Sequence, residues 1–491
     1  MRFKEIFFTF ILSLLLLSSC GRDERTTPTI KQFNVVSSTR CTYHAQSLEI
    51  KFSMTDSDIK VSISDDAEWT TNLKVASNRS IIVDISENDG VERSTTITLS
   101  ATGYKSAKII LKQNGIPTST ANHTLMYYFF STSLNRYFAT NIDDTKLAIE
   151  NGALGDNNRV IYFRQRNMNE AYIAELFYDP DNGRCLESII EDNITIDNAP
   201  LTSEYISRTL NRLSAAAPAE RYGLILAGHG TAWIPRESPS ISKSGAWIPL
   251  FVPASGAEVT RHFGENNVLV NQSNIAEGIN NSEVDIDYIL FDACFMSNIE
   301  TIYELRNSAN YIIASPCEIM GRGFPYERTL PHLFRDNGAT TDYTAAAESY
   351  YLYYRDEYTS SSRCGSVAVY DCSEIEILKD ATKEVIKSAK EEYDINALQT
   401  YEGKDPHYFY DFGEWVNTVA TDNVALQNFN TQLDKTVIAK YTLDTFYSAY
   451  GSYGTFPINA EVYSGVTTSA PSEVLNSLWK DTEWYKSVWE L

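Results

Sequence analysis

Two apolar runs of this chain end abruptly in small and polar residues, and these runs constrain the fold most. YGLILAGHGTAW (222–233) places His229 between two glycines, and YILFDACFMSN (288–298) passes from apolar residues into Asp292, Ala293 and Cys294. Short apolar runs bounded by turn residues are typical of buried strands. Segments with helical spacing separate several such runs, and this alternation predicts an α/β fold with a mostly parallel sheet covered by helices.

The predicted elements follow this alternation from residue 125 onward. We expect an N-terminal cap at Thr202 for the helix that stops before Pro218. In a parallel sheet, ligands bind at the carboxyl ends of strands, where His229, Cys294 and Pro316 are expected. The expected strands are 125–132, 159–167, 171–179, 223–230, 288–294 and 311–316, and the expected helices are 141–154, 202–218, 273–279 and 296–307.

The residue types at two of these strand ends suit nucleophilic catalysis. A cysteine nucleophile needs a base within reach, and neighbouring parallel strands would bring His229 to Cys294. The N–H groups of Gly230 and Cys294 would then form an oxyanion hole, and the N-terminus of the following helix would favour the Cys294 thiolate. A buried cysteine is, however, often an inert core residue, and a loop histidine is often an ordinary polar residue. The residue types alone leave both interpretations open.

The first twenty residues have the features of an export signal. Arg2 and Lys4 precede an apolar run, 6–17, that is too short to span a membrane as a stable helix. LSSC (17–20) resembles a bacterial lipobox, in which the chain is cut before the cysteine and Cys20 is lipidated. Residues 1–19 would be the signal peptide and 20–32 a tether, which predicts a lipoprotein anchored to the outer membrane or cell surface. An ordinary signal peptide is the alternative.

Residues 33–115 alternate between apolar and polar positions in several short runs separated by turn residues such as ENDG. This pattern predicts a small all-β sandwich, followed by a linker at 116–124. Trp69, SNRS (77–80) and the closing ATGYKSAKIILKQNG (101–115) resemble a BACON domain. That resemblance implies glycan binding, and the alternative is a spacer that lifts the next domain from the membrane.

Charge and cysteine content exclude several other classes of protein. A net charge of −23 argues against nucleic-acid binding, because the phosphate backbone would be repelled. The seven cysteines are too sparse for a disulfide scaffold of 491 residues. The chain lacks CxxC and HExxH spacings, so we expect no structural metal site.

LAGHGTAW (226–233) and the stretch DYILFDAC through ASPCEIMGRGFPY (287–326) together resemble the clostripain family of cysteine peptidases, relatives of caspases and gingipains. The resemblance covers residues 125–491 and implies a caspase-like α/β sandwich. It implies that Cys294 attacks the peptide carbonyl and that His229 transfers protons to the leaving amine. Asp292 matches the aspartate at the base of the family's specificity pocket, which pairs with Arg or Lys of the substrate. A structural acceptor at the strand end is the alternative for Asp292.

The resemblance therefore implies an endopeptidase that cuts protein or peptide substrates after a basic residue. No cofactor is expected for the chemistry, although the resemblance allows for a calcium requirement. The chain departs from the family pattern in a long loop after His229 and at Cys317, which we expect near Cys294 either as a redox-sensitive group or as an incidental small residue. A surface binding or adhesion lipoprotein that keeps the fold without turnover is the second hypothesis.

Overall fold

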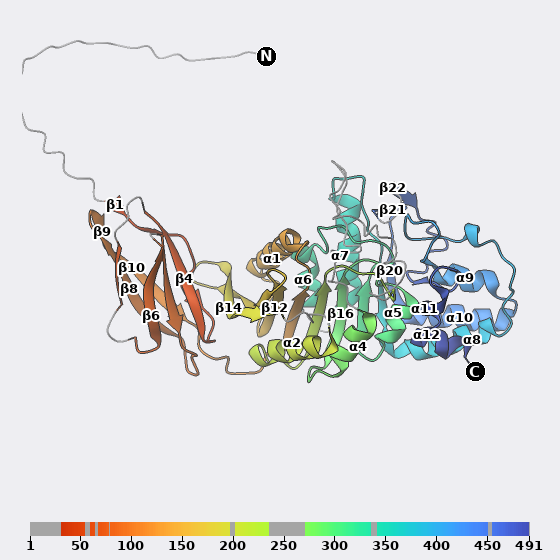
Figure 1. The fold of residues 1–491 in the computed structure, drawn as a ribbon, viewed down its shortest axis with the longest axis horizontal. Coiled ribbons are helices and arrows are strands. Elements are labelled where there is room, and N and C mark those ends of the chain that lie inside the picture. Colours follow the sequence, from red (N-terminus) through yellow and green to blue (C-terminus); the bar gives the residue numbers. More distant parts are fainter. Residues whose placement is uncertain are drawn as a thin grey trace, which may run out of the picture.

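The computed structural model consists of a small β-sandwich followed by a large sheet with helices on both faces (Figure 1). The predicted signal peptide, Cys20 and most of the loop after His229 lie outside the described residues. Within the described ranges no helix is long and apolar enough to cross a membrane. The structure describes residues 31–54, 59–63, 67–77, 79–196, 202–234, 271–334, 341–449 and 454–490.

The N-terminal sandwich consists of two four-stranded sheets. Inward-facing residues such as Ile50, Val83, Leu99 and Leu111 alternate with exposed ones and form a common core between the sheets. One sheet has the order β2 (Asn34–Val35), β4 (Gln46–Ser53), β7 (Ser80–Ile85) and β6 (Thr70–Ser77). The other has the order β3 (Arg40–Cys41), β10 (Ala107–Gln113), β8 (Arg93–Ala101) and β5 (Ile59–Ile63), and β1 (Lys31–Gln32) pairs separately with β9 (Tyr104–Lys105).

The large sheet has nine strands, and its five central strands, from β12 to β17, are parallel. Antiparallel strands flank this centre on both sides. The sheet order is β14 (Arg184–Thr195), β13 (Glu170–Asp179), β12 (Asn158–Gln165), β11 (His123–Phe129), β15 (Tyr222–Ala227), β16 (Ile286–Asp292), β17 (Tyr311–Ala314), β18 (Val367–Asp371) and β20 (Val437–Tyr441).

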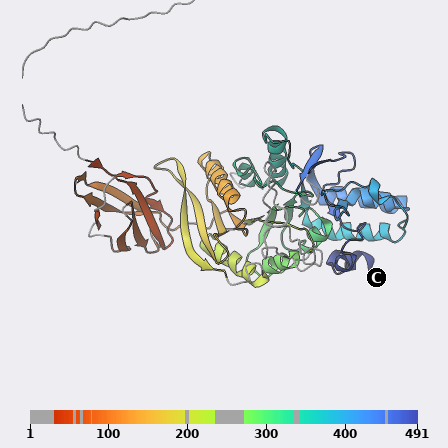
Figure 2. The ribbon, with the colours of Figure 1, turned by 45° about the horizontal axis from the view of Figure 1, so that its top comes forward.

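Two apolar clusters, one on each face, bury the central strands. Figure 1 shows α1, α6 and α7 above the sheet and α2 and α4 below it, and Figure 2 shows the same layers from a tilted view. The upper helices are α1 (Asn135–Glu150), α6 (Tyr326–Leu333) and α7 (Tyr343–Asp356). The cluster on the other face contains residues of α2 (Ser203–Ala216), α4 (Gln272–Asn280), α5 (Ile299–Glu304) and α8 (Ile375–Ile386). The predicted α/β class, a sheet with a parallel centre preceded by a β region, is confirmed.

The predicted N-terminal cap at Thr202 matches the structure, because short-range chemistry decides where a helix begins. The Thr202 side chain accepts a hydrogen bond from the Tyr205 N–H and caps α2, as expected for a helix N-terminus. The C-terminal part of the chain adds further helices and short strands. They are β19 (Tyr410–Asp411), α9 (Phe412–Val419), α10 (Asn423–Thr436), β21 (Thr445–Ser448), β22 (Gly454–Pro457), β23 (Thr467–Thr468), α11 (Asn476–Trp479) and α12 (Glu483–Trp489).

The sandwich contacts the edge strand β14 and the turn before it. Arg40 of β3 is buried and forms ion pairs with Asp179, at 3.1 Å, and with Asp181, at 2.5 Å. The Tyr43 hydroxyl donates a hydrogen bond to the Ala216 carbonyl, and the Ser188 hydroxyl bonds to Gln46 at 2.5 Å. Because these groups are largely buried and hydrogen-bonded, the sandwich is attached to the sheet along its edge.

Candidate active site

The strands that carry His229 and Cys294 are immediate neighbours in the sheet. Strands β15 and β16 are parallel and in register from Gly223 opposite Tyr288 to Ala227 opposite Asp292. Just beyond the strands, the Gly228 N–H donates to the Asp292 carbonyl at 3.3 Å. The two apolar runs thus end at the same edge, so that His229 and Cys294 both lie at the carboxyl end of the parallel sheet.

The two glycines around His229 are required by close packing. A Cβ at position 228 would lie 2.3 Å from the ring of Phe130. A Cβ at position 230 would lie 2.3 Å from the carbonyl oxygen of Cys294 and 3.0 Å from its amide nitrogen. Only glycine allows this approach of one backbone to another. Gly230 therefore brings the histidine loop directly against the backbone of Cys294.

Cys294 is completely buried at the start of a strained turn. Its Sγ accepts a hydrogen bond from the Ile319 N–H at 3.1 Å. Phe295, the next residue, has a φ of +63°, a left-handed backbone conformation that residues other than glycine rarely adopt. Its N–H donates to the Cys317 carbonyl at 3.0 Å, and its ring stacks on Phe409. Such backbone strain is typical of functional sites, where surrounding contacts hold it in place.

The expected stabilisation of the Cys294 thiolate by a helix N-terminus is wrong. Helix α5 begins only at Ile299, and Asn298 is its cap, accepting a hydrogen bond from the Thr301 N–H. The effect of a helix dipole is confined to the first turn, so it does not extend back to Cys294. The segment between them instead pairs with the residues after β17, as in the hydrogen bond from the Ser297 N–H to the Ser315 carbonyl at 3.0 Å.

His229 has a hydrogen-bond partner that the sequence did not indicate. Its side chain is largely buried, and Nε2 lies 2.9 Å from the Ser133 hydroxyl. A second hydroxyl, that of Ser131, lies 3.0 Å from Ser133. Both serines follow β11, the strand next to β15. The available signal in the sequence was the polar segment STSLN (131–135), which follows a third apolar run. Only the strand order shows that this segment meets His229.

Asp292 lies beneath the segment that follows β17. Its side chain is completely buried, and one carboxylate oxygen accepts hydrogen bonds from the Tyr326 hydroxyl at 2.8 Å and from the Phe324 N–H at 3.4 Å. Both donors belong to GFPY (323–326), one of the motifs that carried the family resemblance. Asp292 therefore acts as a buried acceptor for the GFPY segment.

A buried glutamate connects the helix after Cys294 to the C-terminal part of the chain. Oε1 of Glu300 accepts hydrogen bonds from the Thr468 hydroxyl (2.8 Å), the Ser469 N–H (3.0 Å) and the Trp479 indole (2.8 Å). The indole of Trp233, four positions after His229, donates to the Ser469 hydroxyl at 2.7 Å. Burial raises the pKa of Glu300. This network joins the His229 loop and the Cys294 segment through residues distant in sequence.

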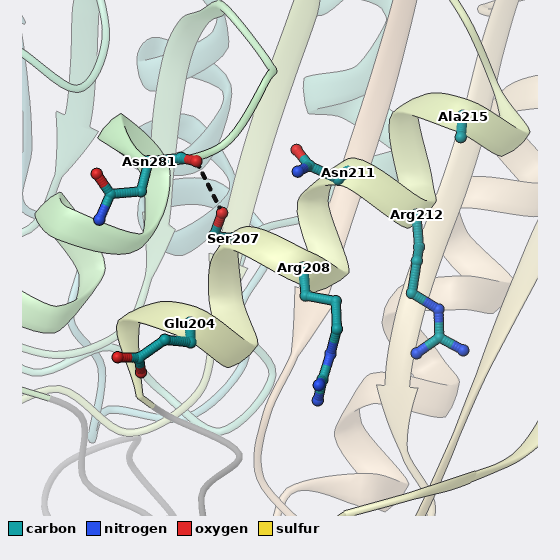
Figure 3. Close-up of a pocket in the computed structure, with 7 residues that line it drawn as sticks. All are labelled: Glu204, Ser207, Arg208, Asn211, Arg212, Ala215 and Asn281. Carbon is teal, nitrogen blue, oxygen red and sulfur yellow. Dashed lines mark hydrogen bonds between the residues drawn. The ribbon is translucent and has the colours of Figure 1, made fainter.

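The described residues show no metal-binding cluster at this site or elsewhere. The described residues contain no group of three or more His, Cys, Asp or Glu side chains able to hold a metal ion. A hollow of about 490 Å³ lies on α2 beside Asn281, the residue that follows α4 (Figure 3). None of its lining residues is among the predicted site residues. They are Glu204, Ser207, Arg208, Asn211, Arg212, Ala215 and Asn281.

Comparisons with known proteins identify the family to which this fold belongs. Residues 126–453 match the model of the clostripain family, Peptidase_C11. Clostripain from Hathewaya histolytica is 21% identical over 244 residues, which cover 43% of this chain and 44% of that protein, so the chain matches about half of that relative's length.

Two solved structures match this chain over nearly their whole length. A secreted C11 cysteine protease from Bacteroides thetaiotaomicron, "iotapain", is 32% identical, with a TM-score of 0.64, over 75% of this chain and 100% of its own. An inactive zymogen C11 protease from Parabacteroides distasonis is 27% identical, with a TM-score of 0.62, over 76% and 99%. The residues matched by the family model, 126–453, include both His229 and Cys294 of this chain. The chain belongs to the clostripain family of cysteine peptidases.

Proposed function

We propose that this protein is an endopeptidase in which Cys294 and His229 form the catalytic dyad. The observation that carries the proposal is the pairing of β15 with β16, which places both residues at one sheet edge. Sγ of Cys294 attacks the peptide carbonyl and forms a thioester while the amine leaves with a proton from His229. Water then hydrolyses the thioester and restores the thiol. No metal or cofactor takes part in these steps.

Ser133 is proposed to hold the imidazole of His229 in position. Its hydroxyl bonds to Nε2, so Nδ1 is the ring atom through which His229 exchanges its proton with the thiol and the leaving amine. For Nδ1 to accept a proton, the neutral ring carries its hydrogen on Nε2, and Nε2–H donates to the Ser133 oxygen in the neutral ring and in the imidazolium alike. A base oriented by a third group is the general arrangement of activated nucleophiles.

The backbone beside Cys294 is proposed to stabilise the tetrahedral intermediate. The Gly230 backbone lies against that of Cys294, so the N–H groups of these two residues are the candidate oxyanion-hole donors. The strained turn at Phe295 supports this role because it directs the backbone away from a regular strand immediately after the nucleophile.

The preferred substrate is proposed to carry Arg or Lys before the scissile bond. The negative group that would pair with this cation is Asp292, two residues before Cys294 and buried near it. Its hydrogen bonds to Tyr326 and Phe324 would hold the carboxylate in place when the substrate binds. A desolvated carboxylate favours a guanidinium or ammonium over neutral side chains.

We propose that the described conformation is a latent form. Cys294 and Asp292 are completely buried, and the Ile319 N–H donates a hydrogen bond to Sγ of Cys294. A peptide therefore reaches Sγ only after the surrounding segments move. One relative of 27% identity is described as an inactive zymogen, which supports latency as a property of this fold.

The protein is further proposed to act outside the cytoplasm, attached through a lipid on Cys20 to the outer membrane or cell surface. The LSSC segment supports the lipid, and a relative of 32% identity is described as secreted. Glycan binding by residues 33–115 is a separate proposal. Its test measures the binding of a panel of glycans to the full chain and to variants with substitutions in the sandwich.

The proposed dyad is tested with residues 21–491 as wild type, as Cys294→Ala and as Cys372→Ala. The last is a matched control, because Cys372 is a buried cysteine in the cluster on the opposite face of the sheet. Fluorogenic peptides ending in Arg, Lys, Asp or Leu are tested with and without calcium, before and after trypsin treatment. Cleavage after Arg or Lys that is lost only in Cys294→Ala is expected. Another preference would overturn the role of Asp292. No cleavage under any condition would favour a binding lipoprotein that keeps the fold.

A further inference from the structure

The segment that carries His229 has an anchoring hydrogen bond on each side of the histidine. On the strand side, the Gly228 N–H donates to the Asp292 carbonyl at 3.3 Å. On the other side, the indole of Trp233 is only 3% exposed, and its Nε1–H donates to the Ser469 hydroxyl at 2.7 Å. A buried indole needs an acceptor for its N–H. This hydrogen bond therefore orients the ring and, through it, the backbone four residues after His229.

Ser469 is the point at which three distant segments meet. Its hydroxyl donates to the Tyr408 carbonyl at 2.7 Å, which leaves the hydroxyl oxygen to accept the Trp233 N–H. Its own N–H donates to Oε1 of Glu300, in the first turn of α5, at 3.0 Å. All four residues are buried, so these hydrogen bonds are shielded from solvent. Each polar group of the serine side chain and its N–H thus has a defined partner.

The Tyr408 side of this junction leads to the turn that carries the proposed nucleophile. Phe409, the next residue, is completely buried, and its ring stacks on the ring of Phe295 with a centroid distance of 4.9 Å. Phe295 directly follows Cys294 and has a φ of +63°. A residue other than glycine keeps such a backbone conformation only where neighbouring contacts hold it. The ring stack is one of these contacts, and it connects the junction to the residue beside the nucleophile.

We infer that Ser469 is a positioning residue that sets the placement of His229 relative to Cys294. It holds the histidine segment through Trp233 and the cysteine turn through Tyr408, and it is not itself one of the reacting groups. A dyad works only when its two groups are held at the reacting distance. Because one hydroxyl joins both sides, its loss lets the two segments shift against each other. This inference rests on the proposed dyad.

The test removes each end of the hydrogen bond between Trp233 and Ser469. Trp233→Phe removes the donor, and Ser469→Ala removes the acceptor. We expect each to lower kcat by about 10- to 100-fold and to change KM by less than about 2-fold, because the dyad is misplaced while the peptide still binds. The double variant should be no slower than the slower single variant, because both changes remove the same bond. Losses of kcat that multiply in the double variant would overturn the inference.

Trp415→Phe is the matched control. Trp415 is 5% exposed, and its indole donates to the Tyr393 hydroxyl at 3.3 Å in the apolar cluster on the opposite face of the sheet. It should lower the Tm about as much as Trp233→Phe while kcat stays within about 2-fold of the wild type. Equal losses of kcat in the two variants would mean that the Trp233 bond only stabilises the fold. A change in KM alone would mean that Trp233 lies against the substrate. Either result would overturn the inference.

A second measurement does not depend on peptide cleavage. Hydrogen–deuterium exchange of peptides that cover residues 224–234 reports the amides of the histidine segment, among them the hydrogen-bonded N–H groups of Gly228 and Ile234. We expect faster exchange there in Ser469→Ala and not in Trp415→Phe. Unchanged exchange in Ser469→Ala would overturn the inference in an active or an inactive chain. Faster exchange in a chain whose wild type cleaves no peptide would contradict the proposed function and not the positioning of this segment.

Discussion

At the residue scale, the proposed site depends on contacts of single atoms. The Ser133 hydroxyl lies 2.9 Å from Nε2 of His229, and the missing side chain of Gly230 leaves room for the backbone of Cys294. Neither feature contributes much apolar surface, so their effects belong to the geometry of the site rather than to the core.

Removing the Ser133 hydroxyl is expected to lower kcat. In Ser133→Ala the imidazole loses the group that holds Nε2, and we expect a fall of about 10- to 100-fold in kcat with KM changed less than about 2-fold. Steady-state kinetics measures kcat and KM for both proteins.

Two variants control this result. Ser133→Thr keeps a hydroxyl and should recover most of the rate, and Ser131→Ala removes only the more distant hydroxyl, 3.0 Å from Ser133, and should have a smaller effect. Equal losses in Ser133→Thr and Ser133→Ala would mean that size, rather than the hydrogen bond, matters at this position.

Adding one methyl group at Gly230 is expected to abolish activity. The Cβ would meet the Cys294 carbonyl oxygen at 2.3 Å, and because this neighbour is backbone, the His229 loop must move away from Cys294. We expect at least a 100-fold loss of kcat/KM in Gly230→Ala, since misplacement by about 1 Å has effects of this size. The matched control is Gly90→Ala, where the added Cβ has only an ordinary contact at 3.6 Å. Normal activity in Gly230→Ala would contradict the close approach.

At the element scale, local periodicity predicted most helices and strands of the first two thirds of the family domain. Thr202 caps α2 where expected, and the runs around 224–227 and 288–292 form neighbouring buried strands. Helix α5 begins at residue 299, three residues later than the predicted start at 296. Apolar spacing does not show that the turn at Phe295 delays the first helical residue. The short strands β19 and β23 were missed, since two-residue strands carry no period.

The Glu300 network is expected to hold three elements together. Its Oε1 accepts three hydrogen bonds from residues 468, 469 and 479, so Glu300→Ala leaves three buried donors without this acceptor. We expect Glu300→Ala to lower the free energy of unfolding by about 3 kcal/mol. Denaturant unfolding at pH 7 measures this change.

Glu300→Gln is the conservative comparison. It keeps an oxygen acceptor and removes the buried charge, so its loss should be smaller than that of Glu300→Ala. Because burial raises the folded-state pKa of Glu300, the wild type should lose stability as pH rises from the unfolded-state pKa through the folded-state pKa, and Glu300→Gln should lose this dependence. Equal destabilisation by both substitutions would indicate that shape, not the acceptor, is important.

At the scale of the whole molecule, the sandwich and the peptidase sheet meet at an interface of ion pairs and hydrogen bonds, some of them buried. Arg40 pairs with Asp179 and Asp181, and Lys112 also pairs with Asp181 at 2.5 Å. His44 lies at the same interface, with its ring 4.0 Å from that of Tyr43 and its Nε2 3.9 Å from Glu175. Burial and the charge of Arg159 lower the pKa of His44 to about 4.

Acid is therefore expected to weaken this interface. Above about pH 6.5, the ordinary pKa of histidine, His44 is neutral in both states and adds no pH dependence. As pH falls toward 4, the unfolded or undocked state takes up a proton first, and stability is lost over this window. Thermal unfolding at pH 7, 6, 5 and 4 should show a larger loss in the wild type than in His44→Gln. An equally steep loss in His44→Gln would assign the effect to other groups.

What the sequence by itself determined was the set of elements and the ends on which His229, Cys294 and Asp292 lie. Apolar periodicity, caps and glycines act over a few residues, so they can be deduced without the fold.

The tertiary structure alone decided the neighbours of those residues. Strand order placed Ser133 beside His229, loop packing placed Tyr326 on Asp292, and edge docking placed Arg40 beside Asp179 at the end of β13. Each of these contacts joins residues that are far apart in the chain. Their pairing depends on which surfaces are buried together when the layers pack, and no local pattern encodes that choice.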